Sequence, residues 1–268
     1  ALDHRPLTHR ALREHTPVAE ALADAVPAWE PGTAHGYHAT TYGHLLSEVI
    51  RRVTGLTAGR YFARHIAAPL GLDCHIGLTD PADAAGAHLA TMLESKAEAL
   101  MNGEDPGEVI ELRDPTTLTY RATIGSMSQD PADPGVEDPS YGGLGSAQSL
   151  ARLFAALVGE IDGVRLLTPG RLAEVTRPHS EGDCRVMLTP LTWGLGMQLP
   201  DSAVFPASAG LKTAFGLSGA NGVFVFADPE RELAFAYVPN AGSTAMGSMD
   251  ERVRRLVEAT YDSVGRIL

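Results

Sequence analysis

The sequence predicts an α+β fold, in which an antiparallel sheet covered by the C-terminal helix lies beside a mostly helical region. Hydrophobic spacing is the first observation: apart from an irregular stretch at 102–145, apolar residues recur at helical intervals before residue 176, and they alternate with period two beyond Pro190. The second is Ser248-Met-Asp-Glu251, which has the pattern of a capping box before a last helical stretch. Helices and strands in separate stretches of a chain are typical of α+β proteins. We therefore expect one domain over 1–268, with the helical region at 1–185 and the sheet and last helix at 186–268.

Three helical stretches are expected before residue 75. Apolar positions at 6–26 fit one helix or two short ones, because Thr16-Pro17 interrupts the pattern. Residues 40–54 form a helix that ends at Gly55, and 57–70 form another that ends at Gly71. The helix at 40–54 has one apolar face, which carries Leu45, Leu46, Val49, Ile50 and Val53.

The middle and the end of the chain differ in regularity. A long irregular loop is predicted at 102–145, since five prolines lie there among Asn, Asp and Gly. Loops of this kind often line a binding or active site. Helices return at 146–157, with Ser146 as N-cap, and at 168–176, with Pro169 in the first turn. Strands are expected at 193–199, 222–227 and 232–238, and the last two form a hairpin. The final helix should end near Val264.

The charge balance narrows the classes of partner. The 268 residues include 21 Lys+Arg and 33 Asp+Glu, a net charge of −12, which disfavours nucleic acid and anionic membranes. No stretch has the about 18 to 20 apolar residues of a membrane helix, and the first residues do not resemble a signal peptide. Cys74 and Cys184 fit no C-x-x-C pattern, so we expect thiols in the cytoplasm, with secretion as the alternative. Small molecules or proteins are the expected partners.

Two loops could carry chemistry. In the first, His35-Gly-Tyr37-His38 precedes the helix at 40–54, and a phenol near a helix N-terminus suits general-base catalysis. Simple packing of the ring is the more common role. In the second, Phe215 to Gly222, small residues would let a substrate approach a strand, where a backbone N–H could bind an oxyanion. An ordinary glycine-rich start of a strand is the alternative.

The ten histidines form no H-E-x-x-H or paired Cys/His pattern, so neither a metal nor another cofactor is expected.

These loops and three further segments together resemble the serine β-lactamase-like superfamily. The segments are W-E-P-G-T-A-H-G-Y-H-A-T-T-Y-G-H-L-L from Trp29, I-A-A-P-L-G-L-D from Ile66, Y-G-G-L-G-S-A-Q-S-L from Tyr141, W-G-L-G-M from Trp193 and F-G-L-S-G-A-N-G-V-F from Phe215. The resemblance is strongest to the class C-like carboxylesterases, also called family VIII esterases, and to their penicillin-binding relatives. It implies an incomplete β-lactamase/transpeptidase-like fold and a serine hydrolase that cleaves a small-molecule ester or amide through an acyl-enzyme.

The resemblance also implies roles for individual residues. Tyr37 matches the general base of the family, and Leu217-Ser218-Gly219 matches the third motif, which frames the acyl group. The backbone N–H of Ala220 would be an oxyanion donor. His38 and Trp193 complete the expected substrate-binding residues.

Two departures from the family pattern matter for function. Leu217 stands where the family has Lys or His, and neither Lys96 nor Lys212 follows a serine at the spacing of Ser-x-x-Lys. The resemblance places that motif before Ala1. Apolar helix faces and a sheet edge would then need a cover, either an N-terminal fragment or self-association of this chain. The alternatives are a hydrolase whose nucleophile lies upstream, a truncated non-hydrolytic relative that binds ligands or proteins, and an acyltransferase on the same scaffold.

Overall fold

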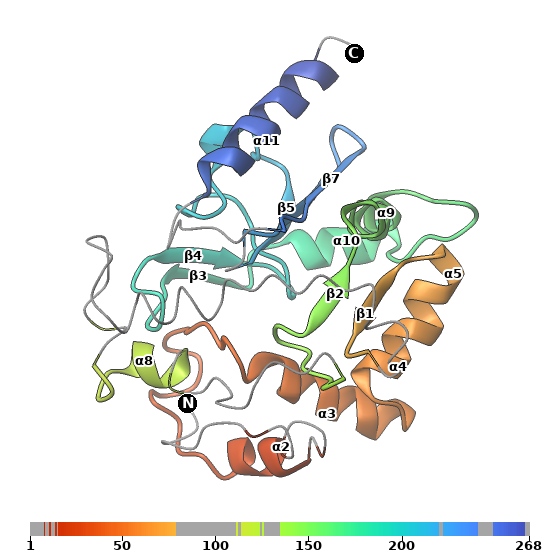
Figure 1. Ribbon diagram of the computed structural model, residues 1–268. Helices are drawn as coiled ribbons and strands as arrows, with labels where there is room; N and C mark the ends of the chain where they lie inside the picture. Colours follow the sequence, from red (N-terminus) through yellow and green to blue (C-terminus); the bar gives the residue numbers. More distant parts are fainter. Residues whose placement is uncertain are drawn as a thin grey trace. The chain divides into compact units, whose positions relative to one another are not determined.

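Two compact units make up the structure, a computed structural model of the chain (Figure 1). It describes residues 8, 11, 14, 16–78, 111, 114–123, 125, 135–219, 222–240 and 249–265. The first unit holds the described residues up to 145 together with 185–188, and the second holds 146–184 and those from 189 onward. Helices dominate the first unit, whereas the main sheet belongs to the second, so the structure is α+β as predicted.

The first unit confirms the helices expected at 40–54 and 57–70. Its helices are α2 (Thr16–Ala23), α3 (Tyr42–Thr54), α8 (Leu118–Ala122) and a continuous stretch of α4 (Ala58–Phe62), the π-helical η1 (Ala63–Ala67) and α5 (Ala68–Leu70). Gly55 follows α3 with φ 73° and Gly71 follows α5 with φ 61°, a left-handed geometry that glycine adopts at least cost. Thr16-Pro17 begins α2, and most of the helical stretch expected before it lies outside the described residues.

Helix α3 buries its polar face. Gly43, His44, Ser47 and Glu48 are buried, whereas much of the apolar side of the helix is exposed. Hydrogen bonds from Arg51 and Arg52 to the Glu48 carboxylate lower its pKa to about 2, so it is ionised at neutral pH. An amphipathic helix normally has the opposite orientation in a folded protein.

A short polar segment, 137–140, anchors the starts of two helices in the first unit. The Glu137 carboxylate accepts hydrogen bonds from Thr57 Oγ1 (2.9 Å) and Gly59 N (2.8 Å) at the start of α4. Ser140 Oγ accepts a hydrogen bond from Gly43 N (2.9 Å) and donates one to the Thr40 carbonyl (2.8 Å) at the start of α3. These side chains satisfy backbone groups that a helix end leaves without intrahelical partners.

The loop expected at 102–145 is only partly irregular where it is described. It contains α8 and also β2 (Gly143–Gly145), which pairs antiparallel with β1 (Cys74–Ile76). Strands of three residues are too short to show an alternating pattern, so the sequence did not indicate them. Residues 102–110 and 126–134 of this loop lie outside the described residues.

The second unit begins with the two helices that were expected, α9 (Ala147–Val158) and α10 (Pro169–Thr176). Ser146 Oγ accepts a hydrogen bond from Ser149 N (3.2 Å), which confirms Ser146 as the N-cap of α9. Thr168 caps α10 in the same way, and Pro169 lies in its first turn. Both helices therefore start where their sequences predict.

An antiparallel sheet forms the centre of the second unit. Its strands follow in the order β5 (Phe215–Ser218), β6 (Phe224–Asp228) and β7 (Leu233–Tyr237), so the expected hairpin is confirmed. A second antiparallel pair consists of β3 (Ser180–Asp183) and β4 (Pro190–Trp193). Single backbone bridges from Gln198 to Trp193 and to Gly216 connect that pair to β5.

The strand predicted at 193–199 is wrong in its position. Strand β4 ends at Trp193, and residues 194–196 form a bend with Gly196 at φ 73°. A Cβ at Gly194 would lie only 2.0 Å from the carbonyl oxygen of Val175, so that glycine serves a close backbone approach and not a strand. The sequence also gave no sign of β3, most of whose residues are exposed.

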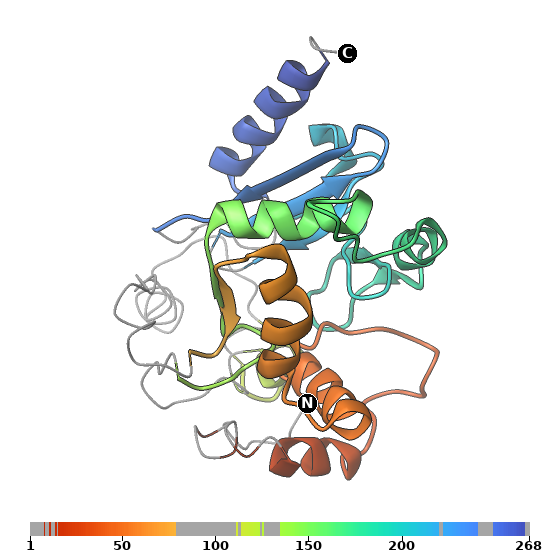
Figure 2. The same ribbon diagram turned by 90° about the vertical axis from the view of Figure 1, so that its right-hand side faces the viewer.

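The main sheet is covered on both faces by helices of the same unit. On β6, Phe224 and Phe226 join a cluster with Val253 of α11 (Glu251–Val264) and with the short 3-10 helix η4 (Ala207–Ala209). Val225 and Ala227, which point the other way, pack in a second cluster with residues of α9. Figure 2 shows α9 and α11 on opposite faces of the strands. The expected covering of the sheet by the last helix is thus present.

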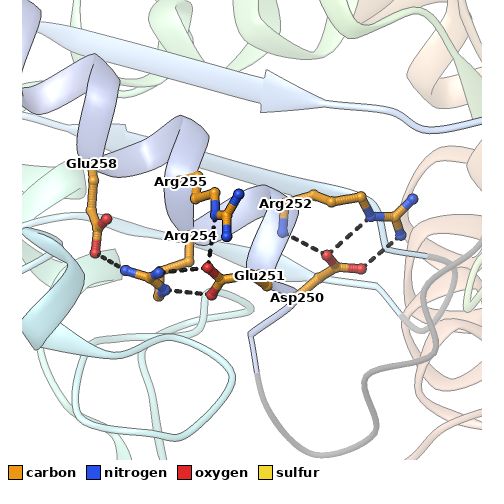
Figure 3. Close-up of polar contacts among 6 residues, drawn as sticks. All are labelled: Asp250, Glu251, Arg252, Arg254, Arg255 and Glu258. Atoms are coloured by element: carbon orange, nitrogen blue, oxygen red, sulfur yellow. Dashed lines mark hydrogen bonds and ion pairs between the residues drawn. The ribbon is translucent and has the colours of Figure 1, made fainter.

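Helix α11 begins later than the predicted capping box. Ser248 lies outside the described residues, and the N-cap is Asp250, whose Oδ1 accepts a hydrogen bond from Arg252 N at 2.8 Å. Figure 3 shows the ion pairs of the first turns, in which Glu251 binds both Arg254 and Arg255. Their hydrogen bonds lower the pKa of Glu251 to about 2, and a carboxylate at this end of a helix also favours the helix dipole.

Asp228, at the end of β6, is a fully buried carboxylate that connects three parts of the second unit. It accepts hydrogen bonds from Thr213 Oγ1 (2.8 Å), Arg231 Nη1 (2.9 Å) and the Tyr261 hydroxyl (3.0 Å). The Arg231 guanidinium also lies 5.1 Å from the centre of the Tyr261 ring. Burial, together with the Asp228 charge, raises the pKa of Tyr261 and keeps its hydroxyl protonated as a donor.

Asp228→Ala should lower the free energy of unfolding by about 3 kcal/mol, because three donors lose a buried acceptor. Asp183→Ala is the matched control: Asp183 is an exposed residue at the end of β3, and we expect a change within about 0.5 kcal/mol. Urea unfolding followed by circular dichroism measures both. Equal stability of the two variants would contradict the role assigned to Asp228.

Candidate active site

The backbone before Tyr37 is held by Trp29. The indole Nε1 donates a hydrogen bond to the Ala34 carbonyl (3.0 Å), and the Arg185 guanidinium lies 5.7 Å from the centre of the ring. Arg185 N donates to the His35 carbonyl (3.0 Å). Gly36 packs so closely that a Cβ there would lie 2.6 Å from Trp29 Cη2. The indole and the segment at 185 therefore fix the chain just before the candidate base.

The backbone after Tyr37 is held by the start of α3. His38 Nδ1 lies 2.8 Å from Thr41 Oγ1, and Thr41 is buried. The Thr40 carbonyl is bound by Ser140, as described above. Tyr37 thus lies between two anchored stretches, and its side chain is 36% exposed. The Tyr37 phenol is therefore accessible to a ligand, while the backbone on both sides of Tyr37 is fixed by hydrogen bonds.

The electrostatic setting of this loop favours neutral groups. Partial burial lowers the pKa of His38, so the imidazole is neutral at pH 7 and one of its ring nitrogens can accept a hydrogen bond. Helix α3 begins at Tyr42, five residues beyond Tyr37. Since the field of a helix dipole falls off within the first turn, the dipole adds little at Tyr37, and neighbouring side chains would have to assist its deprotonation.

The second candidate loop follows β5 in the second unit. Gly216 is required there, since a Cβ would lie 2.0 Å from the Val225 carbonyl oxygen across the ladder. Gly219 N donates to the Val223 carbonyl (2.8 Å), and Gly222 N donates to the Gly219 carbonyl (2.9 Å), which closes the turn. Ala220, the expected oxyanion donor, lies outside the described residues.

Leu217 and Ser218 point to opposite faces of β5. Leu217 pairs with Val225 and Ser218 with Phe224, so Leu217 lies on the face of the sheet that packs against α9. Its side chain is 39% exposed despite being apolar. The position that carries Lys or His in the resembled family therefore presents an uncharged, accessible surface in this chain.

Gln198 connects Trp193 to the second loop. It forms backbone hydrogen bonds with Gly216 in both directions (2.9 and 3.0 Å) and a backbone bridge to Trp193. Its buried side chain donates to Ser202 Oγ (3.1 Å). Trp193 and Leu217–Gly219 therefore belong to one connected part of the second unit, whereas Tyr37 and His38 belong to the first.

Two supporting residues, Ser140 and Gln198, were not found from the sequence. Ser140 comes from the segment predicted as irregular, where the only signal was Asp138-Pro-Ser140, a pattern typical of a turn. Asp138 Oδ1 does accept a hydrogen bond from Ser140 N (2.8 Å). Gln198 lies in the predicted strand at 193–199, which the structure replaces by a bend and by two isolated bridges of Gln198, to Trp193 and to Gly216.

Within the described residues, no three His, Cys, Asp or Glu side chains are grouped so that they could hold a metal ion. The same part of the chain contains no helix with the length and hydropathy needed to span a membrane. Both cysteines, Cys74 and Cys184, are buried thiols.

The chain belongs to the beta-lactamase family, whose sequence model matches residues 2–259. It is 30% identical over 255 residues to the esterase/beta-lactamase LipL of Mycobacterium tuberculosis. The aligned region covers 88% of this chain and 55% of LipL. The chain thus spans little more than half of that curated relative.

Solved structures agree with this family. A penicillin-binding protein homologue from Caulobacter crescentus has 31% identity and a TM-score of 0.76, over 98% of this chain and 70% of its own. A family VIII carboxylesterase has 29% identity and a TM-score of 0.71, over 97% of this chain and 67% of its own. The expected superfamily and fold are confirmed.

Gly36→Ala should destabilise the protein by about 1 to 3 kcal/mol, because the added methyl group overlaps the Trp29 ring and displaces the chain before Tyr37. Gly170→Ala is the matched control: no atom lies within 4 Å of a Cβ there, and alanine should stabilise α10 by about 0.5 to 1 kcal/mol. Thermal and urea unfolding measure both changes. If Gly36→Ala is as stable as Gly170→Ala, the Trp29 contact does not fix this loop.

Proposed function

We propose that this chain forms the larger part of a serine hydrolase that cleaves small acyl esters through an acyl-enzyme. The observation that carries the proposal is membership of the beta-lactamase family over 2–259, with the family motifs in order along the chain. Relatives at 29% and 30% identity are described as a carboxylesterase and an esterase/beta-lactamase. In this proposal the nucleophilic serine belongs to a Ser-x-x-Lys segment outside these 268 residues.

In the proposed reaction, Tyr37 takes the proton from the serine hydroxyl while Oγ attacks the carbonyl carbon of the ester. The bond to the alcohol then breaks, and the alcohol leaves with that proton. Water next attacks the acyl carbon, again with Tyr37 as base, and the carboxylic acid and the free serine are formed. The Ala220 N–H would stabilise the oxyanion of both tetrahedral intermediates. His38, Trp193 and the Leu217–Gly219 segment would contact the substrate.

Leu217 favours neutral acyl esters over substrates that carry a carboxylate. The side chain is accessible and has no charge or hydrogen-bond donor, so a carboxylate bound beside it would lose hydration without gaining a partner. The net charge of −12 adds a general repulsion of anions. We therefore expect faster hydrolysis of uncharged esters than of β-lactams or amides that carry a free acid group. Transfer of the acyl group to an acceptor other than water is the alternative on the same scaffold.

A second candidate function is supported by one observation: the sequence contains no Ser-x-x-Lys. A chain that acts without that segment would bind a ligand or a protein at the family site without hydrolysis. Tyr37 and Leu217 would then be binding residues, and substitution of Tyr37 would change affinity and not a rate.

Tyr37→Phe in the full product of the gene should slow labelling by a serine-reactive fluorophosphonate at least about 100-fold, because the base is lost while the ring is kept. Tyr61→Phe is the matched control, since Tyr61 lies in α4 and packs its ring against His65. Labelling and hydrolysis of p-nitrophenyl acetate are followed with both variants. Labelling that Tyr37→Phe leaves unchanged would contradict its role as base, and a wild-type protein that never labels would favour the binding function.

A further inference from the structure

The loop between β3 and β4 carries an arginine, Arg185, that lies outside every segment on which the family resemblance depends. The loop is closed by a hydrogen bond from Cys184 N to the Thr189 carbonyl (3.0 Å). Residues 185–188 at its tip belong to the first compact unit, which also contains Tyr37. The tip of this loop is therefore packed in the same unit as the candidate base.

Three observations show that the tip of the loop is held in one conformation. The Val186 side chain is 3% exposed, and its Cγ2 would lie only 3.0 Å from a Cβ at Gly36. The Val186 carbonyl accepts a hydrogen bond from Oγ1 of the buried Thr119 in α8 (2.8 Å). Leu188 has a φ of 54°, which a bulky residue adopts only where the surrounding structure imposes it. Arg185 is thus presented from a fixed support.

Arg185 reaches the residues before Tyr37 by two routes. Its backbone N–H donates to the His35 carbonyl (3.0 Å). Its guanidinium lies 5.7 Å from the centre of the Trp29 ring, a cation–π contact, and the Nε1 of the same ring donates to the Ala34 carbonyl (3.0 Å). The second route depends on the side chain, so a substitution of Arg185 can remove it without removing the first.

We propose that Arg185 is a positioning residue for Tyr37: its guanidinium holds the Trp29 indole against the backbone at 34–36, and this contact fixes the position of the phenol. The proposal rests on the proposed function, in which Tyr37 is the base. A base must lie within hydrogen-bond reach of the proton that it takes. A small displacement of the phenol therefore slows the chemical step more than it weakens substrate binding. Arg185 itself is assigned no contact with the substrate.

The test is a double-mutant cycle between Arg185 and Trp29 in the full product of the gene. Arg185→Gln removes the guanidinium and keeps the backbone N–H, whereas Trp29→Leu removes the ring. Hydrolysis of p-nitrophenyl acetate gives KM and kcat, with kcat expressed per serine that a fluorophosphonate labels, so that unfolded protein does not count. We expect Arg185→Gln to lower kcat at least about fivefold with KM changed less than about twofold, and to have no further effect in the Trp29→Leu protein.

Two further variants serve as controls. Arg171→Gln removes an exposed arginine of α10 in the second unit, so it makes the same change in net charge and should leave kcat unchanged. Arg185→Lys keeps a positive charge that can lie over the ring, and it should retain at least about half of the wild-type kcat. If Trp29→Leu does not fold, the comparison of Arg185→Lys with Arg185→Gln decides, and equal losses in the two would overturn the proposal.

Additive effects of Arg185→Gln and Trp29→Leu would overturn the proposal, because Arg185 would then act independently of the indole. An unchanged kcat in Arg185→Gln, or an equal loss in Arg171→Gln, would overturn it as well. Tyr37→Phe separates this proposal from the proposed function. If Tyr37→Phe slows fluorophosphonate labelling while Arg185→Gln leaves kcat unchanged, only the positioning role fails. If Tyr37→Phe has no effect, the assignment of the base fails and the positioning role fails with it.

Discussion

The buried carboxylate of Asp228 is the contact on which the second unit depends. Through its three side-chain donors it joins the end of β6, the loop before β5 and helix α11. An ionised group without exposed surface is stable only while its partners are present, so the turn after β6, Thr213 and Tyr261 are positioned together. Strand β6 in turn pairs with β5, with Val225 opposite Leu217 and Phe224 opposite Ser218, and the turn at Gly219 follows β5.

Close backbone approach is the second constraint, and it explains why the motifs of this chain are rich in glycine. At Gly36, Gly194 and Gly216 a Cβ would lie 2.0 to 2.6 Å from a ring or a carbonyl oxygen of a neighbouring segment. In each case the glycine lets two elements meet directly beside a candidate site residue: Tyr37, Trp193 or Leu217. The glycines of these motifs are therefore required for close packing around the site, in addition to any role of the motifs in its chemistry.

How much of this the sequence could predict depended on whether a feature was local. The helices α3, α9 and α10, the glycine that ends α3, the Ser146 cap of α9 and the β6–β7 hairpin follow from periodicity and from residues within a few positions, and they were predicted. The pairing of β1 with β2 joins residues about 70 apart, and the bonds from Glu137 and Ser140 to the starts of α4 and α3 join residues about 80 to 100 apart. No local pattern encodes such contacts, so the loop at 102–145 was predicted as irregular. The predicted site residues divide between the two units for the same reason: the motifs identify them, whereas their mutual geometry is a property of tertiary structure.

Helix α3 shows how far a correct local prediction can be from a correct tertiary one. The sequence identifies its extent and its apolar face, and the usual inference is that this face points into the core. The face is exposed because the opposite side of the helix is held: Ser140 Oγ accepts a hydrogen bond from the backbone N–H of Gly43, and the buried His44 side chain lies 3.8 Å from the Asp138 carboxylate. Burying the apolar face by rotating α3 would break buried polar contacts, each of which is costly to leave unmade. The polar contacts of α3 therefore decide which of its faces is buried, although the apolar periodicity taken alone predicts the opposite orientation.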